Sequence, residues 1–368
     1  MAENKEEVKT AKEADLSVVN NGQKNNFEPT TAFVFMDKVT KILDISLSTG
    51  KNCILHGPGG YGKSEFTYSY FREKGIEPYV ITMGSGMTTD RLFGGVDLMK
   101  FNETGKIEYL IENSFMNQEF VIFEELFDAP DFILEQLKDI LSSGIFRNGS
   151  QVFEIKTQNI VCCTNKTREE FSKNLSLRAL MERFPLEMEV KWETHNRLTY
   201  QKLLEAKFGA GNVDPLTTYI LEEYAKKSIK ISPRIALVAA DVVDKCGPEC
   251  LEFIADFQTK ENILKDAMSK FKSIAVINEK VEKITGIIKD LKLFIANGLG
   301  TQIEVDQATQ LNKELYNEIN ALTRIKADDS MAVSTANQAK QFSDHHRSFT
   351  KSIALTSAIS DTLTDAIG

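Results

Sequence analysis

The apolar positions of residues 28–193 alternate between short continuous runs and runs at helical spacing. The short runs, which predict strands, are CILHG (53–57), PYVITMG (78–84), FVIFEE (120–125), NIVCCTN (159–165) and LEMEV (186–190). Helical spacing covers 33–47, 64–75 and 131–144. Strands that alternate with helices predict an α/β fold with a parallel sheet and helices on both faces. Residues 144–158 alternate about Asn148-Gly149, a strong hairpin signal.

The rest of the chain has a different pattern. Residues 194–258 predict a small helical domain, and residues 1–27 are polar and predict a disordered lead-in. In the extension at 259–368, a heptad seam predicts a helical hairpin or an antiparallel coiled coil. The final forty or so residues show only weak helical periodicity. The seam consists of Ile274, Ile277, Val281, Ile284, Ile288, Leu291 and Ile295.

The composition disfavours nucleic-acid-coating, membrane-spanning and secreted proteins. The formal net charge of −9 argues against a protein that mainly coats nucleic acid. No run approaches the roughly 20 apolar residues that cross a bilayer, and the acidic N-terminal segment predicts no signal peptide. Five cysteines, an odd number, favour a reducing cytoplasm. The CGPEC segment (246–250) lacks histidines at ligand spacing, so we expect structural thiols rather than half of a metal site.

Residues 57–64 follow the pattern G-x-x-x-x-G-K-[ST] between a predicted strand and a predicted helix. Glycines let backbone N–H groups wrap a phosphate closely, and the next helix offers its positive end. In this pattern the lysine reaches the β- and γ-phosphates and the hydroxyl holds Mg²⁺. The alternative, a glycine-rich turn with an incidental lysine, is disfavoured by the strand–helix context. The predicted nucleotide-binding residues are Gly57, Pro58, Gly59, Gly60, Tyr61, Gly62, Lys63, Ser64 and Glu65.

Two acids end the apolar run FVIF. We expect Glu124 to lie beside Ser64 and to engage Mg²⁺ through water, and Glu125 to orient or deprotonate the attacking water. The alternative is a pair of solvent-exposed glutamates at a strand end. The first acid of such a pair is usually aspartate, and glutamate adds one methylene. A slightly different metal geometry is therefore predicted.

From about residue 35 to 250, the order of these motifs resembles AAA+ ATPases of the MoxR and dynein-related branch. The segment EELFDAP (124–130) is similar to the branch's D-E-[IL]-x-x-A-P, and IVCCTN, RALMERF and SPRIALVAA follow in the expected order. TTDRLFGGVDL (88–98) resembles the branch's D-[IL]-x-G stretch, which precedes an inserted element, less closely because Arg91 adds a residue. Cobalt-chelatase small subunits and gas-vesicle ATPases look similar. The resemblance implies a P-loop NTPase αβα sandwich with a small all-helical lid.

The resemblance also implies three further roles. Asn165 matches the sensor-1 residue, placed between the γ-phosphate and Glu125; its alternative is an ordinary turn residue. Arg183 matches the arginine finger that completes a neighbouring subunit's site, and Arg178 either shares that task or makes a surface ion pair. Arg234 matches sensor 2, although Ser232 and Pro233 would begin a helix whatever Arg234 does.

Other nucleotide-binding classes fit less well. A GTPase needs N-K-x-D, and this chain has Asn165-Lys166 followed by arginine at the aspartate position, Arg168. A small-molecule kinase gives no reason for the SPR segment or the trailing heptads.

We therefore expect a cytoplasmic AAA+ ATPase that uses ATP and Mg²⁺ and forms a homo-oligomeric ring, a hexamer. The resemblance implies a chaperone-like protein that remodels or activates a client or a von Willebrand A (vWA) domain partner. One alternative is a nucleotide-gated scaffold with little turnover, and another is a DNA-acting loader, which the acidic charge disfavours. The extension either packs internally or between subunits, or serves as a docking arm.

Overall fold

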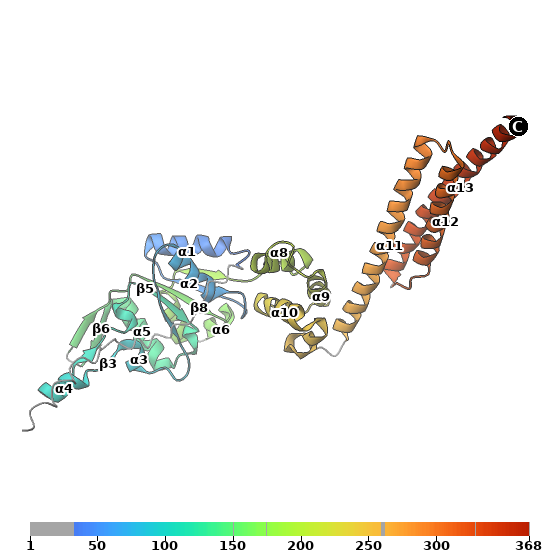
Figure 1. Ribbon diagram of the computed structural model, residues 1–368. Coiled ribbons are helices and arrows are strands. Elements are labelled where there is room, and N and C mark those ends of the chain that lie inside the picture. Colours follow the sequence, from blue (N-terminus) through green and yellow to red (C-terminus); the bar gives the residue numbers. More distant parts are fainter. Residues whose placement is uncertain (1–32, 150, 174, 259–261, 328, 368) are drawn as a thin grey trace, which may run out of the picture. The chain divides into compact units, whose positions relative to one another are not determined.

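The structure is a computed structural model that describes residues 33–149, 151–173, 175–258, 262–327 and 329–367 (Figure 1). The chain forms two compact units, Met1–Trp192 and Glu193–Gly368, and each is described by itself. The predicted lead-in at 1–27 lies outside the described residues. The domain limits drawn from the sequence at 28–193, 194–258 and 259–368 remain predictions.

The first unit contains the predicted parallel sheet. Its strand order is β2-β5-β8-β1-β9, and all four neighbouring pairs are parallel. The carboxyl ends of the strands therefore meet at one edge. All five predicted strands are confirmed, and β8 is buried throughout. The bounds are β1 Cys53–His56, β2 Tyr79–Thr82, β5 Phe120–Glu124, β8 Asn159–Thr164 and β9 Leu186–Glu189.

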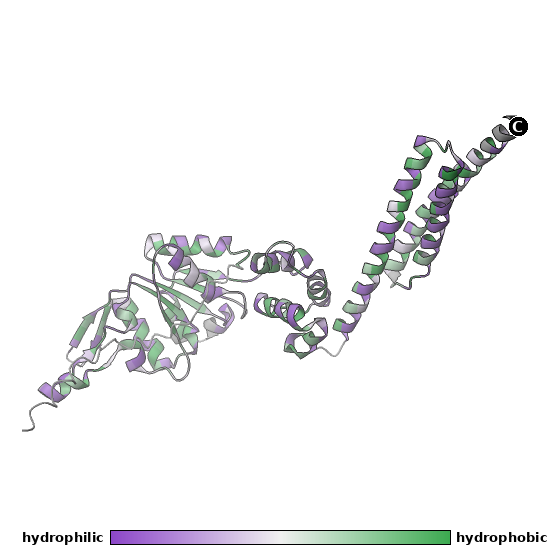
Figure 2. Ribbon diagram, viewed as in Figure 1, coloured by the Kyte–Doolittle hydropathy of each residue, from purple (hydrophilic) through white to green (hydrophobic). Residues whose placement is uncertain are grey.

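Helices cover both faces of this sheet (Figure 1). On one face lie α1 (Asp37–Thr49) and α2 (Lys63–Glu73). On the other face, α3 (Thr89–Phe93), α5 (Asp131–Ser143) and α7 (Leu175–Met181) enclose a hydrophobic core, and the short α6 (Arg168–Lys173) precedes α7. The strands are mostly hydrophobic in Figure 2 because they are covered on both sides. α1 begins later than the predicted residue 33, because Phe35 has a φ of 62°, outside the helical region.

Two antiparallel excursions leave the sheet. The predicted hairpin at Asn148-Gly149 is confirmed as β6 (Ile145–Asn148) paired with β7 (Gln151–Glu154). The second excursion comprises β3 (Gly95–Val96), α4 (Leu98–Thr104) and β4 (Tyr109–Leu110). Only glycine fits at position 94, where this excursion begins, because φ is 99° and an added Cβ would lie 2.1 Å from the Leu110 carbonyl oxygen. α4 buries none of its residues.

Short 3₁₀ segments complete the chain trace. Two belong to the first unit and follow β4 and β5; the other two belong to the second unit and follow its third helix. They are η1 (Phe115–Asn117), η2 (Leu126–Asp128), η3 (Pro248–Phe253) and η4 (Ala255–Phe257).

The second unit is helical. It begins with α8 (Arg197–Phe208), α9 (Pro215–Lys226) and α10 (Pro233–Cys246), which pack on one another. Three longer helices follow, α11 (Ile263–Asn297), α12 (Gln302–Thr323) and α13 (Asp329–Ile367). None of the helices in the described part of the chain combines the length and apolar content that a bilayer crossing requires.

The C-terminal bundle differs from the predicted two-helix hairpin. α13 covers the segment of weak periodicity and packs on both α12 and α11 (Figure 1). The seam of α11 is therefore covered within the chain, with Ile277, Ile284 and Leu291 in the shared core. Two lysines of α11, Lys280 and Lys283, reach Glu318 of α12 at 3.0 and 2.7 Å and lower the pKa of that carboxyl.

One buried polar residue interrupts the apolar core of the bundle. Asn312 of α12 is 8% exposed, and its side-chain amide donates to the Thr350 hydroxyl of α13 at 2.8 Å. Its side-chain oxygen accepts no hydrogen bond from any described residue. A buried amide of this kind fixes the register of helices at some expense in stability.

Candidate nucleotide site

The loop after β1 is shaped by glycine. Gly57 has a φ of 134°, and an added Cβ would lie 2.5 Å from the Val190 carbonyl oxygen. That part of the backbone is fixed, because the Val190 N–H donates to the His56 carbonyl at 2.7 Å. At the other end of the loop, Gly62 (φ 78°) turns the chain into α2, which has no side-chain cap on its first turn. Its N–H groups are thus available to an anion.

The predicted loop residues lie together around Lys63. Lys63 is 7% exposed, and its ammonium donates to the carbonyls of Gly57 and Pro58 and to Asn165 Oδ1, each at 2.8 Å. Three oxygens therefore hold the charge inside the loop. Gly59 faces Asn165, because its added Cβ would lie 3.7 Å from Oδ1.

The remaining loop residues are placed around this centre. Gly60 has a φ of 80°, so it also adopts a backbone conformation that favours glycine. Glu65 lies half-buried in the first turn of α2. Tyr61 is buried, and its ring packs edge-on against Trp192 with 6.0 Å between the ring centroids.

The two predicted acids form hydrogen bonds with the two strands that flank β5, one acid with β2 and the other with β8. The Thr82 hydroxyl at the end of β2 donates to Glu124 Oε2 at 2.6 Å. Glu125 Oε2 instead accepts from the Asn165 N–H at 3.1 Å and the Thr164 hydroxyl at 3.4 Å, both at the end of β8. Glu125 has a φ of 50°, a left-handed conformation that is uncommon outside glycine and recurs at functional sites.

Asn165 connects the loop with the second acid. Its side chain accepts from Lys63, while its backbone N–H donates to Glu125. The structure therefore brings Lys63, Asn165 and Glu125 into one hydrogen-bonded chain. The neighbouring Lys166 ties the same turn to η2, since its ammonium lies 2.7 Å from both the Phe127 carbonyl and the Asp128 carboxylate.

Ser64 lies over the middle of the sheet. Its hydroxyl lies close enough to the Cys163 thiol to oppose the rise in the pKa of that thiol, and the Thr67 hydroxyl lies 3.8 Å from the same sulfur. Burial raises the pKa of Cys163 to about 12, so this thiol stays protonated and uncharged at neutral pH. The cysteines of the sheet are therefore structural. All five cysteines are free thiols, and only Cys246 is exposed.

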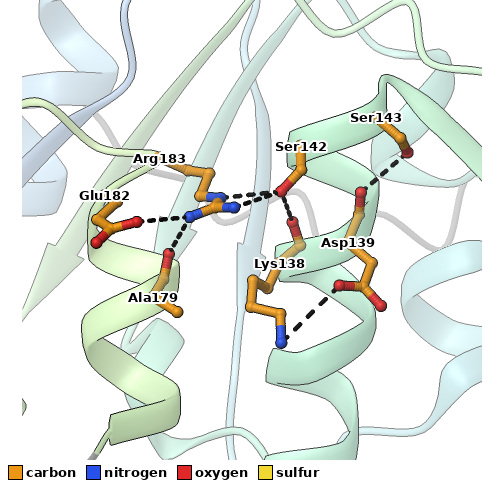
Figure 3. Close-up of polar contacts among 7 residues, drawn as sticks. All are labelled: Lys138, Asp139, Ser142, Ser143, Ala179, Glu182 and Arg183. Carbon is orange, nitrogen blue, oxygen red and sulfur yellow. Dashed lines mark hydrogen bonds and ion pairs between the residues drawn. The ribbon is translucent and has the colours of Figure 1, made fainter.

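Arg183 is engaged within its own chain (Figure 3). Its Nε and Nη2 donate to the Ser142 hydroxyl at 2.9 and 2.8 Å, and its Nη1 donates to the Ala179 carbonyl at 2.7 Å and pairs with Glu182 at 3.0 Å. Ser142 in turn donates its proton to the Lys138 carbonyl at 2.6 Å. The side chain of Arg183 is 27% exposed, so it is fastened to the end of α5 without being enclosed in the core.

The other two predicted arginines are exposed. Arg178 lies on α7 and Arg234 in the first turn of α10. Ser232 caps α10 by accepting a hydrogen bond from the Ile235 N–H at 3.4 Å. This confirms the prediction that Ser232 begins a helix whatever Arg234 does. Arg234 belongs to the second unit, so its sensor role remains a prediction, as does the role of Arg178.

The geometry fits a nucleotide and a metal ion. The glycine backbone leaves a cradle at the uncapped start of α2, with an ammonium beneath it. Ser64 and Glu124 supply a hydroxyl and a carboxylate, ligand types that Mg²⁺ accepts alongside phosphate oxygens and water. Among the described residues, no cluster of three or more His, Cys, Asp or Glu side chains is arranged to hold a metal by itself.

His56, directly before the loop, makes stability depend on pH. It is 8% exposed, and its Nε2 lies 3.2 Å from Glu187, which also pairs with Arg168. Burial lowers the pKa of His56 and outweighs the opposing effects of Glu187 and Glu189; Arg168 and Lys63 lower it further. The folded chain therefore keeps the imidazole neutral where the unfolded chain takes up a proton, below about pH 6.5.

We expect the free energy of unfolding to fall as the pH decreases below about 6.5, and His56→Gln to weaken that dependence. Thermal unfolding from about pH 5.5 to about pH 7.5, on either side of that value, measures both. His195 and His346, whose pKa values burial also lowers, leave a residual slope. His345→Gln, at an exposed position, is the control. Equal slopes for wild type and His56→Gln would contradict the assignment.

Several residues around the site were not predicted from the sequence. Thr82 and Ser142 carry no motif, and their partners become visible only once the strands and helices are packed. Phe33 lies against the loop, since an added Cβ on Gly62 would lie 3.4 Å from its ring. Phe35 packs on Trp192 at 5.7 Å. The sequence pattern predicts only the start of a helix for the run FVF at 33–35.

Comparisons with known proteins give a family match and several distant structural likenesses. Residues 23–225 match the family described as the MoxR domain in the MoxR-vWA-beta-propeller ternary systems. Among solved structures, NtrX from Brucella abortus in complex with ADP is 15% identical, with 56% of this chain and 48% of that chain covered and a TM-score of 0.39. A putative ATPase from Cytophaga hutchinsonii is 15% identical (58% and 70% covered, TM-score 0.36). A point mutant of RuvB from Thermotoga maritima is 14% identical (71% and 79% covered, TM-score 0.41).

These structural likenesses are too distant to bear on function, and the chain spans only about half the length of the ADP-bound NtrX chain. The family match rests on different grounds, because it covers more than half of the 368 residues and includes the loop, both acids and Asn165. The chain belongs to the MoxR family of AAA+ ATPases.

Proposed function

We propose that this chain hydrolyses ATP in a homo-oligomeric ring and uses the energy to remodel or activate a protein partner. The observation that carries the proposal is the hydrogen-bonded chain from Lys63 through Asn165 to Glu125. It joins the group that would bind the terminal phosphates to the group that would activate water. A change at the phosphate thus alters the contacts of the catalytic acid directly.

Each residue has a definite chemical task in this proposal. Lys63 leaves the loop carbonyls to contact the β- and γ-phosphates, and Glu125 accepts a proton from the attacking water. Asn165 orients Glu125 through its backbone N–H and senses the phosphate through its side chain. Ser64 and Glu124 would hold Mg²⁺, which neutralises charge on the phosphates when bound.

The ring supplies what one subunit lacks. Arg183 would act on the site of a neighbouring subunit, where a guanidinium stabilises charge that develops in the transition state. In the structure, its guanidinium is held by Ser142 and Ala179. Engagement of a neighbour's phosphate therefore requires that at least some of these internal contacts be exchanged, which links assembly to a rearrangement at the end of α5.

A protein partner is supported by the excursion around α4. It concentrates exposed apolar side chains, with Leu98 and Met99 at 69% and 75% exposure. Such clusters mark interaction surfaces more often than isolated residues do. The family description, which names vWA and beta-propeller components, makes a vWA-domain protein the proposed partner. The exposed apolar residues are Val96, Leu98, Met99, Phe101, Ile107 and Leu110.

A nucleotide-gated scaffold is the second candidate, and Glu124 favours it. The longer acid is hydrogen-bonded to Thr82, an arrangement that need not support rapid turnover. The two candidates differ in phosphate release, since a scaffold binds ATP and releases phosphate slowly whether or not Glu125 is intact.

Nucleotide-dependent capture tests the partner proposal. A purified vWA-domain protein from a MoxR-vWA-propeller system is presented to the immobilised chain with ATP, ADP or no nucleotide. We expect the Glu125→Gln chain to retain it most strongly with ATP, because the ATP state is then long-lived. Lys63→Ala, which should bind ATP poorly, is the control. Equal capture under all three conditions would contradict nucleotide-driven remodelling.

A further inference from the structure

The row of residues at the carboxyl edge of the sheet places Glu124 between two groups. In the register of the sheet, Thr82 lies opposite Glu124, and Glu124 lies opposite Cys163. Paired residues in neighbouring strands point to the same face of a sheet. Here that face is the one covered by α2, because the Cys163 thiol lies 3.8 Å from the Thr67 hydroxyl of that helix.

The two sides of Glu124 are chemically different. On the Cys163 side lies Ser64, the hydroxyl proposed to hold the metal. On the other side the Thr82 hydroxyl donates to Oε2 at 2.6 Å, a length typical of a hydrogen bond to a charged carboxylate. The Met83 N–H also donates to the Glu124 carbonyl at 2.8 Å, so the two strand ends are fixed relative to each other. Thr82 therefore pulls one carboxylate oxygen toward β2.

We propose that Thr82 is a positioning residue that makes Glu124 a direct metal ligand through one oxygen, in place of the water-mediated contact expected from the sequence, and so favours Mg²⁺ over larger cations. Because Thr82 holds Oε2, the proposal assigns the metal to the other oxygen, Oε1. Mg²⁺ demands near-octahedral geometry and keeps several waters, whereas Ca²⁺ accepts both oxygens of a carboxylate. The hydroxyl compensates for the extra methylene of glutamate by restricting how the longer side chain can turn. This inference rests on the proposed Mg²⁺–ATP function.

Metal-dependent nucleotide binding tests the proposal without hydrolysis. The full-length chain is titrated with Mg²⁺ or Ca²⁺ in the presence of a fluorescent, non-hydrolysable ATP analogue. For Thr82→Val, we expect the Mg²⁺ concentration at half-maximal binding to rise about three- to tenfold, the size expected for loss of one hydrogen bond to a charged group. The value for Ca²⁺ should stay constant or fall, so that the preference for Mg²⁺ shrinks.

Two further variants identify the cause. Thr82→Ser keeps the hydroxyl and should restore the wild-type preference. Adding Thr82→Val to Glu124→Ala should leave the metal concentrations at half-maximal binding as they are in Glu124→Ala alone, because no carboxylate remains to be oriented. Thermal unfolding of each variant shows that the chain is folded. An effect of Thr82→Val that persists without Glu124, or that Thr82→Ser does not repair, would overturn the assignment.

The outcomes for the wild type separate this inference from the proposed function. If the wild-type chain binds the analogue with Mg²⁺ dependence and Thr82→Val matches it in both metals, only the role of Thr82 fails. If wild-type binding is independent of any divalent cation, Glu124 contacts no metal, and both the metal part of the proposed function and the inference fail.

Discussion

Replacing Glu125 with glutamine is expected to lower the kcat of phosphate release by about 10²–10⁴-fold while ATP binding persists. The amide has nearly the same size as the carboxylate but cannot accept the proton of the attacking water. Glutamine and glutamate have similar backbone requirements, so the φ of 50° at this position should be kept and folding should be unaffected. Phosphate release and binding of a fluorescent ATP analogue, measured on the same preparations, check both parts.

Glu135→Gln is the matched control for this variant. It makes the same chemical change on the exposed side of α5, close in sequence to Glu125. We expect it to release phosphate at the wild-type rate. Equally slow release by the wild type and Glu125→Gln, with ATP binding intact in both, would favour the nucleotide-gated scaffold over the motor.

Arg183→Ala is expected to lower kcat by about 10³-fold or more, the range typical of arginine fingers. This variant also removes the contacts with Ser142 and Ala179 (Figure 3), so a loss of rate alone does not distinguish the two roles. Ser142→Ala separates them in part. It removes the internal partner and keeps the guanidinium, so it should retain most of the wild-type rate.

Mixed assemblies give the decisive measurement for Arg183. Arg183→Ala subunits have an intact loop, and Lys63→Ala subunits have an intact Arg183; each is expected to be inactive alone. When they are mixed, a Lys63→Ala subunit can lend its arginine to a neighbour with a working loop, so activity should return. Should the mixture stay as inactive as its components, Arg183 would act only within its own chain, where it fastens the end of α7 to α5.

The sheet and the loop could be predicted because their signals are local. Each strand is a short apolar run, and the glycines that need unusual φ angles lie next to Lys63 in the sequence. Glu125 and Asn165 each follow directly at the end of an apolar run, so parallel strands bring them to one edge. The contact of Asn165 with Lys63 follows from this arrangement, although the two are 102 residues apart.

The remaining features depend on packing that no local pattern encodes. The Thr82–Glu124 hydrogen bond exists only because β2 and β5 are neighbours in one register. Ser142 of α5 accepts from Arg183, which lies 41 residues further along the chain, in the turn after α7. The last helix could not be predicted for another reason. Its buried positions include the small residues Ala339 and Thr335, which give weak hydrophobic periodicity but allow close helix packing.

The buried side chain of Asn312 affects which helix pairings are stable when several copies of the chain lie close together. In the proposed ring, identical bundles at high local concentration invite helix exchange, in which α13 of one copy would pair with α12 of another. Slippage by a turn would separate the Asn312 amide from Thr350 and leave its donor group, as well as its oxygen, without a partner in an apolar layer. A single polar side chain thus penalises helices that pair out of register, whether the third helix comes from the same copy or from another.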